Sequence, residues 1–312
     1  MRVVSEEQVR KFLDPAQAIA ILEAAFKRDY HATVQVPLRT HMTLASGSIL
    51  LLMPCHDAGT GAVGMKVVTV HESATAARDR VNAQFVLVDE TTGAIRGIVE
   101  ANYLTDIRTA ALSAIATRIL ARPDASTLGL FGTGRQALAH ILVLQGSHAF
   151  RRVLVCGSNP SSSEEFVANL CNRWQIAAQA VDSDTCAAES DVICTCTTAK
   201  TPVFDGRLIR PGTHLNLVGS FQPQSREVDD EVIRSARICV DTYEGALAEA
   251  GDLRMPLQTG VISRRQIVAD LHELLNGTHL ARQSATEITV FKSVGCALAD
   301  LVIANLLYGL GT

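Results

Sequence analysis

The feature that most constrains the fold is a glycine turn between an apolar run and an amphipathic one. The segment Thr127-Leu-Gly-Leu-Phe-Gly-Thr-Gly-Arg-Gln-Ala137 passes from an extended apolar pattern into a helix pattern that continues to Leu144. Gly132 and Gly134 permit a tight turn and a close approach to a pyrophosphate, and Ala137 lets helix and strand pack closely. The helix N-terminus offers unpaired N–H groups to an anion. The sequence therefore predicts dinucleotide contacts at Gly132, Thr133, Gly134, Arg135 and Gln136.

The pattern that follows this turn supports the prediction, because a lone G-x-G-x-x-A also precedes helices in folds that bind nothing. Short apolar runs recur after it, and a capping box at Ser161-x-x-Glu164 predicts a helix toward Trp174. The expected strands are 152–156, 176–181, 192–197, 214–219 and 237–240. This alternation predicts parallel βαβ units with right-handed crossovers, and so an α/β fold with a Rossmann-type doubly wound parallel sheet.

A chain of 312 residues is long for a single core, so the residues before the turn predict a second domain, of α+β type. A helix should begin at Asp14 and Pro15 and end near Tyr30. Expected strands are 38–44, 48–53, 64–70 and 83–88, and an alanine-rich helix should run over 105–122. We place the first domain at 1–122, completed by 285–312 with a last helix over 295–308, and the dinucleotide-binding domain at 123–284.

Composition excludes several function classes. The net charge is −4 and no Lys/Arg-rich tract is present, so we expect no nucleic-acid partner. No apolar run reaches the ~18 residues of a membrane span, and an N-terminus with Glu6, Glu7 and Lys11 does not resemble a signal peptide. The cysteines and histidines lack zinc-ligand spacing and no G-x-S-x-G motif occurs, so we expect no metal and no serine nucleophile. A cytoplasmic enzyme with buried reduced thiols fits best.

Lys66 lies in an extended apolar run, where alternation places it on one face with Gly64 and Val68. A lysine central to an apolar face loses hydration unless an anion meets it. The alternative is an edge strand whose lysine discourages aggregation, and the pattern favours neither.

Arg108 heads an apolar helical stripe and so should point inward. If Thr105 caps the helix, Arg108 lies in the first turn, where the helix dipole opposes a cation. An inward guanidinium at this place suits a carboxylate, which it can bind with two parallel hydrogen bonds. The alternative is an internal ion pair. Arg39 alternates with His41 on a polar pattern, which by itself favours a solvated strand face.

Several segments together resemble the ornithine cyclodeaminase and mu-crystallin family along nearly the whole chain. They are Pro37-Leu-Arg39, Gly64-Met-Lys66, Leu104-Thr-Asp-Ile-Arg-Thr-Ala-Ala111, Gly132-Thr-Gly-Arg-Gln-Ala137, Gly212-Thr-His-Leu-Asn-Leu-Val-Gly219 and Ile288-Thr-Val-Phe-Lys-Ser-Val-Gly295. The resemblance implies a homodimer whose first domain binds substrate and dimerises. It also implies that Arg39, Lys66 and Arg108, with Val294 and Gly295, surround a small amino or imino acid. The dinucleotide would be bordered by Thr197, Val218 and Ser293.

Position 221 departs from the cyclodeaminase pattern. Cyclodeaminases carry an acid/base aspartate two residues after the Val-Gly pair, whereas this chain has Phe221 after Val218 and Gly219. Phenylalanine cannot move a proton, so the chain is more similar to the reductases of cyclic ketimines. The expected reaction reduces Δ1-pyrroline-2-carboxylate or Δ1-piperideine-2-carboxylate to L-proline or L-pipecolate. The alternatives are an amino-acid or N-alkyl amino-acid dehydrogenase, an ornithine cyclodeaminase, and a non-catalytic binding protein.

The expected chemistry is mainly orientation and electrostatics. Arg39 and Arg108 would hold the carboxylate while hydride passes from the nicotinamide to the imine carbon. Lys66 would bind the carboxylate or relay a proton, and in the second role its pKa should be lowered by burial and by the arginines. His56 and His71 are alternative proton donors, although a structural role is more usual for either.

The strand over 152–156 is followed by Gly-Ser-Asn-Pro, without the carboxylate that would bind the ribose hydroxyls of NAD and repel a 2′-phosphate. Ser158 and Asn159 can donate hydrogen bonds to phosphate, and Arg135 adds positive charge. NADPH is therefore the preferred cofactor and NADH the alternative.

Overall fold

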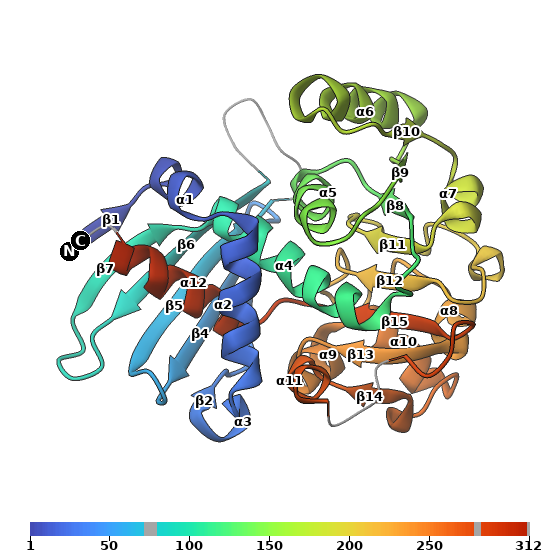
Figure 1. The fold of residues 1–312 in the computed structure, drawn as a ribbon. Helices are drawn as coiled ribbons and strands as arrows, with labels where there is room; N and C mark the ends of the chain where they lie inside the picture. Colours follow the sequence, from blue (N-terminus) through green and yellow to red (C-terminus); the bar gives the residue numbers. More distant parts are fainter. Residues whose placement is uncertain (72–79, 278–281, 311–312) are drawn as a thin grey trace. The chain divides into compact units, whose positions relative to one another are not determined.

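The computed structural model describes residues 1–71, 80–277 and 282–310 (Figure 1). They form two compact units. Unit 1 comprises Met1–Arg108 with the C-terminal segment from Cys296, and unit 2 comprises Thr109–Gly295. The helix α4 (Asn102–Leu120) begins in unit 1 and continues into unit 2.

Unit 1 is an α+β layer structure built on one sheet. The strand order is β1 (Arg2–Val4), β7 (Ile95–Glu100), β6 (Val81–Val88), β5 (Ala62–Val70), β4 (Ile49–Asp57) and β2 (Val34–Gln35), and β3 (Thr40–Thr43) also pairs with β4. All pairs are antiparallel except β1 with β7. The helices are α1 (Glu6–Phe12), α2 (Pro15–Lys27), α3 (Tyr30–Thr33) and α12 (Ala297–Leu310). Helix α12 lies across β4 to β7, and α2 packs on α12 (Figure 1).

Burial alternates along the central strands of this sheet, as period-two side-chain geometry requires. In β5, Gly64, Lys66 and Val68 are buried whereas Met65 and Val67 are half-buried. Strand β4 alternates in the same way. The buried face is the one covered by α12, because Lys66 forms an ion pair with Asp300 of that helix. The opposite face carries half-buried apolar side chains.

Helix α4 begins three residues earlier than the sequence pattern predicts, so Thr105 is not its N-cap and Arg108 lies in the second turn. The backbone N–H of Thr105 already donates to the carbonyl of Ala101 at 2.9 Å. The free N–H of Tyr103 donates to the carboxylate of Glu6 in α1, at 3.1 and 3.2 Å to its two oxygens. The cap therefore comes from a distant residue, which a local capping pattern cannot reveal.

Unit 2 is a Rossmann-type doubly wound sheet in which all pairs are parallel. The strand order is β10 (Gln179–Ala180), β9 (Arg152–Cys156), β8 (Thr127–Phe131), β11 (Val192–Thr195), β12 (His214–Leu217), β15 (Ile288–Lys292), β13 (Ala236–Val240) and β14 (Ile267–Ala269). The chain runs from β8 outward to β10 in one direction and then from β11 to β14 in the other, and β15 returns to lie between β12 and β13. Ligands bind at such a switch point, outside the carboxyl ends of the strands.

The helices of unit 2 are α5 (Arg135–Ser147), α6 (Pro160–Trp174), α7 (Ser183–Glu189), α8 (Asp230–Ser235), α9 (Tyr243–Glu249), α10 (Gly251–Thr259) and α11 (Leu271–Asn276). The predicted capping box of α6 is wrong. Asn159 caps this helix by accepting from the Ser162 N–H at 2.9 Å, and Pro160 occupies the first helical position. Among the described residues, no helix is both long enough and apolar enough to cross a membrane.

Strand β15 corrects the predicted division of the chain. The predicted boundary at residue 285 assigns this segment to the first domain, whereas β15 pairs with β12 and β13 inside the sheet of unit 2. Its apolar composition suits a central parallel strand, which is buried on both faces. Only the segment from Cys296, which includes α12, belongs to unit 1.

Candidate functional site

Two of the predicted cations meet on the buried face of the unit 1 sheet. Lys66 Nζ lies 2.8 Å from Asp300 Oδ2, and Arg108 Nε donates to Asp300 Oδ1 at 3.0 Å. Lys66 is 1% exposed and Arg108 5% exposed, while Asp300 is fully buried. Strand β5 is central in its sheet, so the alternative of an edge-strand lysine is wrong. The alternative of an internal ion pair for Arg108 holds, with Asp300 as the acid.

Burial and neighbouring charges make Lys66 an unusual lysine. Burial, and then the charge of Arg108, lower the pKa of Lys66 to about 7, although Asp300 opposes the shift. The charge of Arg39 lowers this pKa further, which brings all three predicted cations into one electrostatic group. A lysine with a pKa near neutrality can both release and accept a proton.

Arg108 retains binding capacity after its bond to Asp300. Its Nη1 is buried and has no hydrogen-bond partner among the residues that the structure describes. A buried guanidinium N–H without a partner is costly, so an acceptor is expected there. The residues present thus fit a small carboxylate, which is the ligand that guanidinium groups bind best.

Asp300 is the part of this group that the sequence analysis missed. It is the single charged residue within α12, whose sequence is Ala-Leu-Ala-Asp-Leu-Val-Ile-Ala-Asn-Leu-Leu-Tyr-Gly-Leu. A lone carboxylate on a buried helix face must be paired. The lone acid in this helix can be recognised in the sequence, but no sequence pattern identifies Lys66 and Arg108 as its partners.

The two histidines considered as proton donors do not join the cation group. His56 faces the opposite side of β4 from the buried Cys55 and Asp57, and its Nε2 lies 2.9 Å from Glu90 Oε1. His71 Nδ1 lies 2.7 Å from Ser48 Oγ. Neither contact involves Lys66 or Arg108, so Lys66 remains the candidate proton donor.

The glycine turn of unit 2 has the geometry that a dinucleotide site requires. Gly132 has a φ of +112°, and a Cβ at this position would lie 2.5 Å from the carbonyl oxygen of Cys196. Gly134 is the N-cap residue of α5 without a side-chain cap, and a Cβ built on it would meet none of the described residues within 4 Å. The N–H groups at the N-terminus of α5 are therefore placed at a glycine turn, as in a site that binds a phosphate. Thr133, Arg135 and Gln136 lie around it.

The other predicted cofactor residues follow the carboxyl ends of parallel strands, which is the ligand edge of such a sheet. Ser158 and Asn159 follow β9, Thr197 follows β11, Val218 follows β12 and Ser293 follows β15. Asn159 uses its side-chain oxygen to cap α6, which leaves its amide N–H groups, one of which donates to Ser158 Oγ at 3.4 Å.

Two buried carboxylates at this edge were not predicted. Asp241 Oδ2 accepts from Ser293 Oγ at 2.9 Å, from Val294 N at 2.9 Å and from Gly295 N at 2.8 Å. Glu227 accepts from the loops after β11 and β12. No local sequence signal marks either residue, because their partners belong to other strands.

Phe221 packs half-buried against the hydrophobic core of unit 2. It offers an apolar surface where the cyclodeaminase pattern has an acid, so no proton can be exchanged at this side chain. The structure thus gives Phe221 a packing role.

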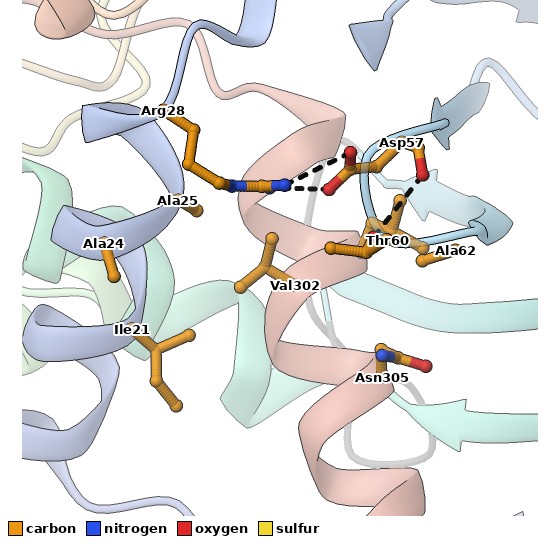
Figure 2. Close-up of a pocket in the computed structure, with 10 residues that line it drawn as sticks. Ile21, Ala24, Ala25, Arg28, Asp57, Thr60, Ala62, Val302 and Asn305 are labelled. Carbon is orange, nitrogen blue, oxygen red and sulfur yellow. Dashed lines mark hydrogen bonds and ion pairs between the residues drawn. The ribbon is translucent and has the colours of Figure 1, made fainter. Parts of the chain in front are cut away.

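Unit 1 also holds a pocket between α2, α12 and the turn after β4 (Figure 2). Its walls include Ile21, Val302 and Asn305, and Arg28 donates to Asp57 across one end at 2.6 and 3.4 Å. None of the predicted site residues lines it. Within the described ranges, no group of three or more acidic, histidine or cysteine side chains is placed to hold a metal ion.

Comparison with known proteins gives consistent results. The model of the ornithine cyclodeaminase/mu-crystallin family matches residues 1–310. Delta(1)-pyrroline-2-carboxylate reductase of Bacillus cereus is 34% identical, over 99% of this chain and 96% of that protein. The same reductase from Thermococcus litoralis, in complex with NADH and L-proline, has a TM-score of 0.95 at 33% identity and covers 99% of this chain and 97% of its own. An archaeal alanine dehydrogenase dimer with bound NAD has a TM-score of 0.92 at 28% identity, over 99% of this chain and 95% of its own.

Proposed function

Since this chain belongs to the ornithine cyclodeaminase/mu-crystallin family and is an oxidoreductase that acts on C=N bonds, we propose that it reduces Δ1-pyrroline-2-carboxylate or Δ1-piperideine-2-carboxylate to L-proline or L-pipecolate. The observation that carries this proposal is the buried Nη1 of Arg108, which has no hydrogen-bond acceptor among the described residues. It lies in the same group of charges as Lys66, whose pKa is lowered. The L-proline bound to the Thermococcus litoralis relative supports a small cyclic amino acid as the product.

The residues divide the work in the following way. Arg108 binds the substrate carboxylate through its free N–H group, and Arg39 adds charge that favours the anion. A bound reduced nicotinamide supplies the hydride. Lys66 holds the proton that the product nitrogen needs, and exchanges it near neutral pH because its pKa is lowered. Phe221 leaves no acid for the amine chemistry of a cyclodeaminase. Val294 and Gly295 are further proposed substrate contacts.

An assay of three substrate classes tests the proposal. The oxidation of NADPH and of NADH is followed with each cyclic imine, with pyruvate plus ammonia or methylamine, and with ornithine alone. We expect turnover with at least one cyclic imine and none with ornithine. Faster turnover with pyruvate and an amine would instead support an amino-acid dehydrogenase, which the archaeal alanine dehydrogenase relative makes the second candidate. Ligand binding without any turnover would indicate a non-catalytic binding protein.

For the cofactor we propose NADPH as the better substrate and NADH as the weaker one. The support is that residues 157–159, which follow β9, contain no carboxylate, while Ser158, Asn159 and Arg135 can meet a 2′-phosphate. The proposed contacts to the rest of the dinucleotide are Gly132, Thr133, Gly134, Gln136, Thr197, Val218 and Ser293. The ratio of kcat/KM for the two cofactors tests the preference, and a ratio in favour of NADH would overturn it.

We also propose that the protein is a homodimer in the cytoplasm. The half-buried apolar face of the unit 1 sheet, opposite α12, offers a surface for a second copy, and the archaeal alanine dehydrogenase relative is described as a dimer. All eight cysteines are free, as is typical of a reducing compartment.

A further inference from the structure

Glu227 collects hydrogen bonds from two neighbouring loops at the ligand edge of unit 2. Its Oε1 accepts from the backbone N–H and the hydroxyl of Thr197, both at 2.8 Å. Its Oε2 accepts from Thr195 Oγ1 at 2.8 Å, from Gly219 N at 2.7 Å and from Ser220 N at 3.1 Å. One carboxylate thus ties the end of β11 and its following loop to the loop after β12.

The two loops touch each other at Gly219. A Cβ at this position would overlap the backbone oxygen of Thr197 and the carboxylate of Glu227, so no other residue fits without moving a loop. The absence of a side chain at Gly219 thus lets both loops reach the same carboxylate.

Glu227 is itself held from behind by a second buried carboxylate. Asp252 Oδ1 accepts from the backbone N–H groups of Glu227 and Val228, at 2.6 and 3.2 Å. Its Oδ2 lies 3.0 Å from Lys292 Nζ at the end of β15. All three charged side chains are fully buried. Burial and the nearby Asp252 raise the pKa of Glu227, while Lys292 and the hydrogen bonds from Thr197 and Thr195 favour the charged form.

The opposite edge of the same sheet carries a comparable carboxylate. Asp191 Oδ2 accepts from Ser126 N at 2.9 Å and from Thr127 N at 3.0 Å, at the start of β8. Its Oδ1 accepts from Arg122 at 2.8 Å. Asp191 therefore joins the amino ends of β8 and β11 as Glu227 joins loops at the carboxyl ends. In an open α/β sheet, ligands bind at the carboxyl ends of the strands, so Glu227 lies at the ligand-binding end and Asp191 does not.

We propose that Glu227 is a positioning residue for the dinucleotide: its carboxylate sets the loops at Thr197 and Gly219–Ser220 in the binding arrangement before the cofactor arrives. This inference rests on the proposed function, because it requires that NADH or NADPH binds at this edge. Loops that are already ordered lose less conformational entropy on binding, so the preset arrangement increases affinity. Glu227 need not touch the cofactor to have this effect.

The test compares Glu227→Gln with Asp191→Asn in the full-length protein. Each change keeps the side-chain size and replaces an acceptor oxygen with an amide that cannot accept from N–H groups. The dissociation constants of NADH and NADPH are measured by fluorescence titration, and thermal unfolding by circular dichroism. We expect Glu227→Gln to weaken dinucleotide binding by roughly tenfold, the effect of losing one hydrogen bond to a charged group. Asp191→Asn should lower the Tm without changing either dissociation constant.

A second variant keeps the inference testable if Glu227→Gln does not fold. Thr195→Val has nearly the same shape and removes a single donor from the Glu227 carboxylate, so it should weaken dinucleotide binding by a smaller factor. Unchanged binding in both variants, or an equal loss in Asp191→Asn, would overturn the positioning role while leaving the proposed function intact. A wild-type protein that binds neither dinucleotide would overturn both.

Discussion

Lys66 shows how burial gives an ordinary side chain a chemical role. In water a lysine is charged throughout the physiological pH range. On the buried face of β5, with Arg108 nearby, its pKa falls to about 7 even though Asp300 is 2.8 Å away. The alternation of β5 placed this residue on a face, and the packing of α12 made that face the interior.

The lowered pKa predicts a pH dependence for the reduction. The protonated ammonium is the proton donor, so kcat/KM for the cyclic imine should fall as the pH rises through about 7. Arginine stays charged over this range, so Lys66→Arg should reduce activity and lose the decline near neutral pH. The measurement is a pH profile of both proteins with the same imine. A wild-type decline that persists unchanged in Lys66→Arg would assign the titration to the substrate.

The role proposed for Arg108 predicts that its loss weakens substrate binding. Arg108→Ala removes the guanidinium that binds the carboxylate and should raise the KM for the imine by roughly 10- to 150-fold, the effect of a lost hydrogen bond between charged groups. The matched control is Arg28→Ala, which removes another arginine paired with a buried aspartate of unit 1. The control should lose stability and keep its KM. An unchanged KM in Arg108→Ala would make this arginine structural.

At the scale of elements, the start of α4 shows why local patterns misplace helix ends. Thr105 has the chemistry of an N-cap, yet the helix already begins at Asn102, because Glu6 of α1 satisfies the N–H of Tyr103. The Glu6 backbone N–H in turn donates to Glu100 Oε2 at 2.6 Å, at the end of β7. Two elements far apart in the sequence thus decide where Arg108 stands on its helix.

This cap predicts a loss of stability without loss of chemistry. Glu6→Ala leaves the first turn of α4 uncapped and should lower the free energy of unfolding by about 0.5–2 kcal/mol, as other cap removals do. The exposed neighbour Glu7 serves as the control, and Glu7→Ala should change stability by less than about 0.5 kcal/mol. Urea denaturation measures both. Equal stability of the two variants would show that the contact to Tyr103 is not a cap.

At the scale of the whole molecule, the sheet face of unit 1 opposite α12 is the proposed contact surface of the homodimer. Val67 is central on this face, paired across the sheet with Leu52 and Gln84. Its side chain alternates with the buried Lys66 and Val68 and is half-buried in the single chain. Such a surface is costly in a monomer when it is large and continuous.

The proposed homodimer predicts a clear effect of charge on that face. Val67→Glu should convert the dimer to a monomer, because a second copy would have to bury the carboxylate. Ala20→Glu, at an exposed position of α2, which packs on α12 on the other side of the sheet, is the control and should leave the dimer intact. Light scattering after size exclusion measures the mass of each. A monomeric wild-type protein would contradict the proposal.

The sequence by itself determined the features that depend on neighbouring residues. The glycine turn at Gly132 and Gly134, the parallel βα alternation after it and the position of Lys66 on one strand face with Gly64 and Val68 all follow from local backbone geometry and side-chain period. They were sufficient to predict the α/β class, and the family resemblance added the expected chemistry, which the comparisons support in its coarser form.

Only the tertiary structure decided how distant side chains satisfy one another. Arg108 and Asp300 are 192 residues apart in sequence and share one buried ion pair. Glu227 gathers donors from two loops, Glu6 caps α4, and β15 lies in the sheet of unit 2. Buried charges and free N–H groups must find partners wherever the fold brings them, and no pattern along the chain states which partners these will be.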